Sequence, residues 1–314
     1  QWCHHTWSPW RGCTKVSEGC KNCYADKTAK RNPSTLGVWG PNGTRIVNAN
    51  WGQLAKWNRL AEKTGVRERV FPSLCDPFED WIGFMHDCKG EIYRHINGEP
   101  ASMQDIRANL FDSIEMYDSL DFLLLTKRQR ISCQCGQSSI DRPASQAIKK
   151  LHSNVWLGTS VEDQQNADKR IPKLLECRHL SPVLWLSVEP LIGPVDLSRI
   201  EATAEILNWR CGGLAANALK SDDQRYYEFD SHIDWVIVGG ESGPNARPCD
   251  IRWIRSIVDQ CREAGVPCFV KQLGENPVDG ERRVKLKDSK GGDPEEWPED
   301  LRVREFPLGV ADRV

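Results

Sequence analysis

The chain has 314 residues, of which 39% are hydrophobic and 27% are charged, and its formal net charge is −2. This length and composition suffice for one large domain with a buried core. The near-neutral charge excludes a globally basic, nucleic-acid-binding surface, so any such contact must be a local patch.

The amino-terminal residues lack the charged-then-apolar order of a signal peptide, and no run of about 18 apolar residues occurs. We therefore expect a soluble, cytoplasmic protein without a membrane partner. Because the chain begins at Gln1 rather than Met, we also expect that a few residues precede it.

Short apolar runs alternate with segments of helical spacing, which is typical of a parallel α/β sheet. A short strand is predicted before Cys13. Six further strands are predicted at 69–71, 122–125, 155–157, 183–186, 235–238 and 268–270. Apolar residues recur at helical spacing over 51–61 and 251–261, and these helices are predicted to end at Gly65 and Gly265.

The domain is predicted to span residues 1–284, with inserted loops near 132–145 and 211–231. Residues 285–314 are predicted to form an extension that packs on the same domain. Cys133 and Cys135 lie in the first loop and offer only two ligands, which leaves a second metal site open.

Polar residues follow nearly every predicted strand, and the carboxyl ends of parallel strands form the active-site face of α/β barrels. We therefore predict one shared cleft. Its candidate residues are Asp76, Lys127, Arg128, Arg130, Thr159, Ser160, Glu162, Ser187, Glu189, Gly239, Gly240, Glu241 and Lys271. Other interpretations of these residues stay open. The Ser, Thr and Glu residues could cap the next helix, and Asp76 could belong to a turn. The basic cluster, which is Lys127, Arg128 and Arg130 with Lys271 expected nearby, could be a solvated loop.

Three cysteines, Cys13, Cys20 and Cys23, lie within eleven residues directly after the first predicted strand. The chain has 13 cysteines, an odd number in a protein too large to need disulfide bonds, which favours reduced thiols. Three thiolates leave one iron of a 4Fe–4S cluster open to a substrate. A structural zinc, with Cys3, His4 or His5 as the fourth ligand, is the main alternative.

The run 6–25, which contains these cysteines, resembles the phage Gp37/Gp68 family, a domain family of unknown function. The blocks 124–128, 155–163, 186–191, 235–243 and 290–304 resemble that family as well. The resemblance therefore covers nearly the whole chain.

That family is in turn similar to radical S-adenosylmethionine enzymes. This resemblance implies a partial (β/α) barrel of about six to seven parallel strands, with a 4Fe–4S cluster on Cys13, Cys20 and Cys23. The spacing departs from the commonest pattern, because six residues rather than three separate the first two cysteines. Asn22 also stands where an aromatic residue is usual, and Tyr24 follows the last cysteine.

The resemblance further implies that the cluster cleaves S-adenosylmethionine to methionine and a 5′-deoxyadenosyl radical. This radical would abstract hydrogen from an unidentified substrate, for which nucleic acids and nucleotides are candidates. Gly239, Gly240 and Glu241 would bind the methionine amino group, although they follow the sixth strand rather than the second. Lys127 would bind a carboxylate or phosphate. From their position at the ends of the fourth and fifth strands, we expect hydrogen bonds to the ribose and methionine groups from Thr159, Ser160, Glu162, Ser187 and Glu189.

The chemistry implies a one-electron donor such as flavodoxin or ferredoxin. The alternative function is a non-enzymatic zinc or iron–sulfur module of a phage-associated protein.

Overall fold

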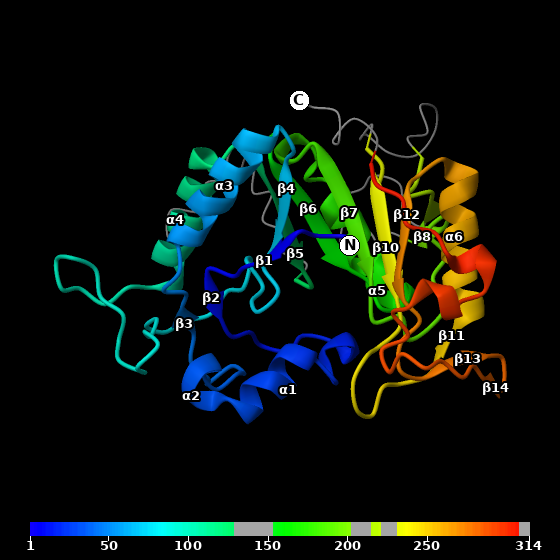
Figure 1. Ribbon diagram of the computed structural model, residues 1–314, viewed down its shortest axis with the longest axis horizontal. Helices are drawn as coiled ribbons and strands as arrows, with labels where there is room; N and C mark the ends of the chain where they lie inside the picture. Colours follow the sequence, from blue (N-terminus) through cyan, green and yellow to red (C-terminus); the bar gives the residue numbers. More distant parts are fainter. Residues whose placement is uncertain (129–152, 202–214, 221–230, 308–314) are drawn as a thin grey trace.

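The computed structural model describes residues 1–128, 153–201, 215–220 and 231–307. Its centre is one seven-stranded sheet in which all neighbouring strands are parallel, and the sheet curves into a half-barrel (Figure 1). In spatial order the strands are β1 (His5–Thr6), β4 (Glu68–Phe71), β5 (Leu120–Thr126), β6 (Val155–Ser160), β7 (Val183–Val188), β10 (Trp235–Gly239) and β12 (Cys268–Gln272). The predicted mixed α/β fold with seven parallel strands is confirmed.

Among the described residues, four helices cover the outer face of the sheet. They are α3 (Gly52–Thr64), α4 (Met103–Met116), α5 (Gln164–Leu175) and α6 (Ile251–Ala264). The two helices predicted from the sequence, α3 and α6, both end at a glycine in the left-handed conformation, with φ of 69° at Gly65 and 71° at Gly265.

The segment after β1 crosses the carboxyl ends of the strands and lies beneath the sheet in Figure 1. It contains η1 (Glu18–Cys20), α1 (Tyr24–Arg31) and α2 (Pro33–Leu36). The remaining short elements are β2 (Trp10–Arg11), β3 (Ile46–Val47), η3 (Arg178–Leu180), β8 (Ile200–Glu201), β9 (Ala215–Ala216), β11 (Cys249–Asp250), β13 (Pro277–Asp279), β14 (Arg282–Arg283), η4 (Pro294–Glu296) and η5 (Glu299–Leu301).

The inner face of the half-barrel is closed near the amino ends of its strands by aromatic side chains, which we call the barrel floor. Its centre is Trp156, Trp185, Trp235 and Phe269, all buried. The rings of Trp156 and Trp235 meet edge to face, with centroids 5.7 Å apart. Any cavity inside the half-barrel must therefore lie toward the carboxyl ends of the strands.

The carboxyl-terminal segment packs on the same body. Trp297 and Leu301 are buried in the main core, and the backbone N–H of Val270 donates to the carbonyl of Val303 at 2.8 Å. The predicted loop at 132–145, with Cys133 and Cys135, lies outside the described residues, as does most of 211–231. Within the described part of the chain, no helix has the length and apolarity needed to cross a membrane.

Candidate functional site

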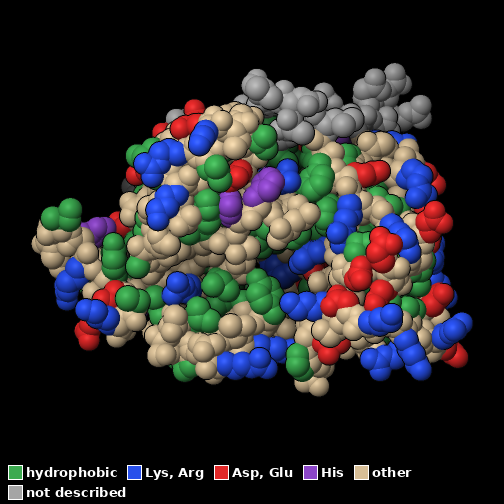
Figure 2. All heavy atoms as spheres, viewed as in Figure 1, with side chains coloured by type: hydrophobic (Ala, Val, Ile, Leu, Met, Phe, Trp, Pro, Cys, Tyr) green, Lys and Arg blue, Asp and Glu red, His purple; other side chains and the backbone are tan. Residues whose placement is uncertain are grey.

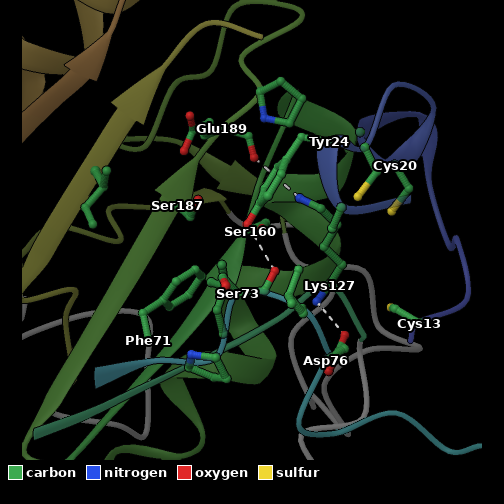
Figure 3. Close-up of a pocket in the computed structure, with 18 of the residues that line it drawn as sticks. Cys13, Cys20, Tyr24, Phe71, Ser73, Asp76, Lys127, Ser160, Ser187 and Glu189 are labelled. Atoms are coloured by element: carbon green, nitrogen blue, oxygen red, sulfur yellow. Dashed lines mark hydrogen bonds between the residues drawn. The ribbon is translucent and has the colours of Figure 1, made fainter. Parts of the chain in front are cut away.

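A cavity of about 500 Å³ lies at the carboxyl ends of the strands, a size typical of small-molecule sites (Figure 3). Every strand of the half-barrel contributes to its wall, so the predicted shared cleft has formed. The contributing side chains include Thr6 of β1, Phe71 of β4, Thr126 of β5, Ser160 of β6, Ser187 of β7, Ile237 of β10 and Lys271 of β12.

The three predicted cysteine ligands, Cys13, Cys20 and Cys23, all line this cavity, and α1 begins directly after the last of them. Burial, with the charges of Asp76 and Glu79, raises the pKa of the Cys13 thiol. Among the described residues, no three His, Cys, Asp or Glu side chains converge as ligands of a single metal ion. A 4Fe–4S cluster does not require three ligands to converge on one ion, since each thiolate binds a different iron.

Glu162 fixes the middle of the cysteine loop, which we define as residues 13–23. Its fully buried carboxylate accepts from the backbone N–H of Gly19 at 3.3 Å and pairs with Arg170 at 2.8 Å. Burial by itself would raise the pKa of Glu162, but Lys127 and Arg170 hold it below its usual range. The carboxylate therefore stays ionised and ties the loop to the end of β6.

Glu241 fixes the end of the same loop from β10. It accepts from the side-chain amide of Asn22 at 2.9 Å and forms a two-pronged ion pair with Arg247, whose Nη2 lies 2.6 Å away. Burial opposes ionisation of Glu241, but the hydrogen bonds from Arg247 and Asn22 lower its pKa. Asn22 thus serves as an anchor of the loop.

Glu79 fixes the start of the cysteine loop. It accepts from the backbone N–H of Thr14 at 2.8 Å and from Arg45 at 2.7 Å and Arg128 at 2.9 Å. Arg45 and Glu79 are both fully buried, so this ion pair is shielded from water. Three carboxylates from distant parts of the chain therefore hold one loop.

The cavity wall carries cations with defined partners. Lys271 pairs with Glu189 at 2.7 Å, and Lys127 donates to the carbonyl of Glu189 at 3.4 Å (Figure 3). Arg128 pairs with Asp76 at 3.0 Å. The predicted proximity of Lys271 to this cluster is seen, while Arg130 lies outside the described residues.

Three of the predicted cofactor-binding residues do not line the cavity. Thr159 donates its hydroxyl to the carbonyl of Thr126 at 2.9 Å, Glu162 lies under the cysteine loop, and Gly239 packs against Gln272. Gly240 does line the cavity, but a Cβ there would lie 2.2 Å from the carbonyl of Leu273. The close packing of position 240 against Leu273, which follows β12, therefore requires a glycine whether or not this residue binds a ligand.

The histidines of the zinc alternative have other partners. His5 Nε2 lies 2.5 Å from Glu68 and its ring stacks on Trp57, while His4 accepts from the backbone N–H of Arg69 at 2.7 Å. Neither histidine lines the cavity, whereas Cys3 does.

Sequence reasoning missed Arg45, Glu79, Arg170 and Arg247. They lie outside the predicted strand ends. Glu79 is 34 residues from Arg45 and 65 from Thr14, while Arg170 and Arg247 are 8 and 6 residues from Glu162 and Glu241. No spacing rule connects such pairs, so only the folded chain could reveal them.

Residues 1–299 match the family described as "Protein of unknown function (DUF5131)". The chain belongs to this family. No match is found among curated proteins or among solved structures.

Proposed function

We propose that the protein is a radical S-adenosylmethionine enzyme in which Cys13, Cys20 and Cys23 hold a 4Fe–4S cluster. The observation that carries this proposal is that three thiols from one short loop face a single cavity built on the ends of seven parallel strands. The resemblance of the cysteine run and the later blocks to the phage Gp37/Gp68 family, and through it to radical S-adenosylmethionine enzymes, supports the same conclusion.

The residues present fit such a group. The donor set is three thiols, which leaves one iron free for a ligand, and a cavity of about 500 Å³ adjoins them. When bound, the cluster supplies one electron that splits S-adenosylmethionine into methionine and a 5′-deoxyadenosyl radical, which abstracts hydrogen from the substrate.

The chain contributes rigidity and charge to this reaction. Glu79, Glu162 and Glu241 hold the cysteine loop through backbone and side-chain hydrogen bonds, so the thiols are positioned before any ligand arrives. Lys127 and Lys271 line the same cavity and offer ammonium groups to an anionic ligand, although Lys271 also pairs with Glu189 at 2.7 Å. The apolar barrel floor closes the cavity on the side of the amino ends of the strands and helps to exclude water.

A purely structural metal site is less well supported. Such a site needs only its ligands, whereas here charged groups line a sizeable cavity next to the thiols. His4 and His5, the proposed zinc ligands, are engaged with Arg69 and Glu68.

The test is to purify the protein without oxygen, reconstitute it with iron and sulfide, and reduce it in the presence of S-adenosylmethionine. We expect a brown protein with about four irons per chain, a spectrum by electron paramagnetic resonance after reduction, and 5′-deoxyadenosine as a product. Cys20→Ala should lose both cluster and product.

Cys88→Ala is the matched control, because Cys88 is exposed and does not line the cavity. It should keep both properties. A colourless protein that retains zinc and forms no 5′-deoxyadenosine would refute the proposal and favour the structural-metal alternative.

A further inference from the structure

The outer surface of the cysteine loop and α1 is basic, although the whole chain has a net charge of −2. Residues 11–31 contain six Lys or Arg side chains and only two acidic ones. Four of these cations are exposed, and we call them the α1 basic face: Lys15, Lys21, Lys30 and Arg31. The segment therefore carries a formal charge of +4 (six cations less two anions), whereas the rest of the chain carries −6 (−2 less +4).

The two acidic residues of this segment offset only part of its outward charge: Glu18 is exposed and lies 3.9 Å from Lys21. Asp26 is buried and lies between Lys15 and Lys30, at 3.0 and 3.1 Å, so it gathers two ammonium groups on one side of the helix. Lys15 also donates to the backbone carbonyl of Lys21 at 3.1 Å, which joins the start of the cysteine loop to its end. Contacts within the segment therefore hold these lysine side chains in place.

The four side chains of the α1 basic face do not line the cavity, but Tyr24 and Ala25 at the start of α1 do. Figure 2 shows a hollow above α1 with Lys and Arg side chains at its rim and inside it. Lys127 and Lys290 line the cavity, as do the aromatic rings of Tyr24 and Trp39. Tyr24 is 56% exposed, and its ring extends into the cavity, where its hydroxyl donates to the carbonyl of Ser73 at 3.1 Å (Figure 3).

We propose that the α1 basic face binds the phosphate backbone of a single-stranded nucleic acid, one base of which enters the cavity beside Tyr24. This inference rests on the proposed function and names the substrate class of the same site. Lysines contribute the phosphate contacts, and an aromatic ring contributes stacking that suits any base. A base inside a duplex cannot reach an enclosed cavity without leaving its stack, so a single strand is preferred.

An acidic electron-transfer protein is the other polyanion that this face could attract. Docking of such a protein would explain the exposed lysines on α1. It would leave the exposed ring of Tyr24 and the Lys290 cation at the cavity without a role, because a folded protein cannot enter there. The nucleic acid accounts for both parts of the surface.

The experiment measures binding of a fluorescein-labelled, mixed-sequence 20-mer, as single-stranded DNA, single-stranded RNA and duplex DNA, by anisotropy over a series of salt concentrations. It uses the full chain without cofactors, so its result is independent of the assay for 5′-deoxyadenosine. We expect a single strand to bind more tightly than the duplex, with affinity that falls as salt rises. Lys30→Glu with Arg31→Glu should weaken binding at least about tenfold and lower the salt slope by about 1–2.

The matched control is Lys56→Glu with Arg59→Glu, because both side chains are exposed on α3, away from the cavity. It should bind as the wild type does. Tyr24→Leu should weaken binding at least about fivefold, whereas Tyr24→Phe, which keeps the ring, should not. A thermal unfolding midpoint for each variant separates lost contacts from misfolding.

Three results would overturn the proposal: no binding of single strands at low salt, equal weakening by the α3 control, or a preference for the duplex. Binding of an acidic flavodoxin that depends on Lys30 and Arg31, without any binding of nucleic acid, would assign the face to an electron donor instead. If nucleic acid binds as expected but no 5′-deoxyadenosine forms, the proposed chemistry fails while the assignment of this surface stands.

Discussion

The two ends of the half-barrel interior are stabilised by different means. The barrel floor is apolar, and rings such as Trp156 and Trp235 are packed together with almost no exposed surface. At the other end, the cysteine loop is held by buried carboxylates, each matched by an arginine. The stability of the barrel floor therefore depends on close packing, and that of the cysteine loop on paired charges. Different substitutions should destabilise the two regions.

The floor should be sensitive to loss of volume and indifferent to pH. Trp235 is fully buried, contacts other aromatic rings and donates its indole N–H to the carbonyl of Glu305 at 2.9 Å. Trp235→Ala should lower the free energy of unfolding by about 3–5 kcal/mol. Denaturant titrations at pH 6 and pH 8 should give the same loss, and Met116→Ala, at an exposed site, should change little. A loss that varied strongly with pH would contradict the comparison.

The cysteine loop should instead respond to loss of a charge at constant volume. Arg170→Met keeps much of the side-chain bulk but leaves the fully buried Glu162 without its closest cation. We expect a loss of about 3–5 kcal/mol in unfolding free energy. Adding Glu162→Gln should recover more than half of that loss, because the amide oxygen can still accept from Gly19. No recovery in the double variant would show that packing, and not charge, is the cause.

Gly19 tests how closely the loop is fitted to its carboxylate. A Cβ at this position would lie 2.8 Å from the carboxyl carbon of Glu162, so Gly19→Ala must displace one of them. The expected loss is about 1–3 kcal/mol in unfolding free energy. Gly52→Ala is the control, since a Cβ there meets no atom within 4 Å. Glu162→Asp, which withdraws the carboxylate, should partly rescue the Gly19 variant; a neutral Gly19→Ala would argue against a close fit.

The smallest effect should appear in the pH dependence of Glu241. Its pKa is lowered in the folded protein by hydrogen bonds from Arg247 and Asn22, which outweigh its burial. Its contribution to stability is therefore fully present above the pKa of the unfolded chain and is lost as pH falls through the folded pKa. The difference in unfolding free energy between wild type and Glu241→Gln should shrink from pH 7 to pH 3. A constant difference would show that the carboxylate contributes only through its shape.

The seven parallel strands and the helices α3 and α6 with their terminal glycines could be predicted from the sequence. The sequence also indicated that strand-end residues such as Lys127, Ser160 and Glu189 share one cavity with the three cysteines. Periodicity and local turn chemistry are encoded by neighbouring residues, and parallel strands bring their ends together by geometry.

Only the tertiary structure decided which polar residues face the cavity and which hold the loop. Glu162, Glu241 and Gly240 all follow strands, as Glu189 does, yet their roles differ. Glu162 holds the cysteine loop from outside the cavity lining, Glu241 lines the cavity and also holds the loop, and Gly240 lines the cavity while it packs against Leu273. Arg45 and Glu79 gave no signal at all before folding. Ion pairs between residues far apart in the chain depend on where the backbone places them, and a single sequence contains no periodic pattern that records such pairs.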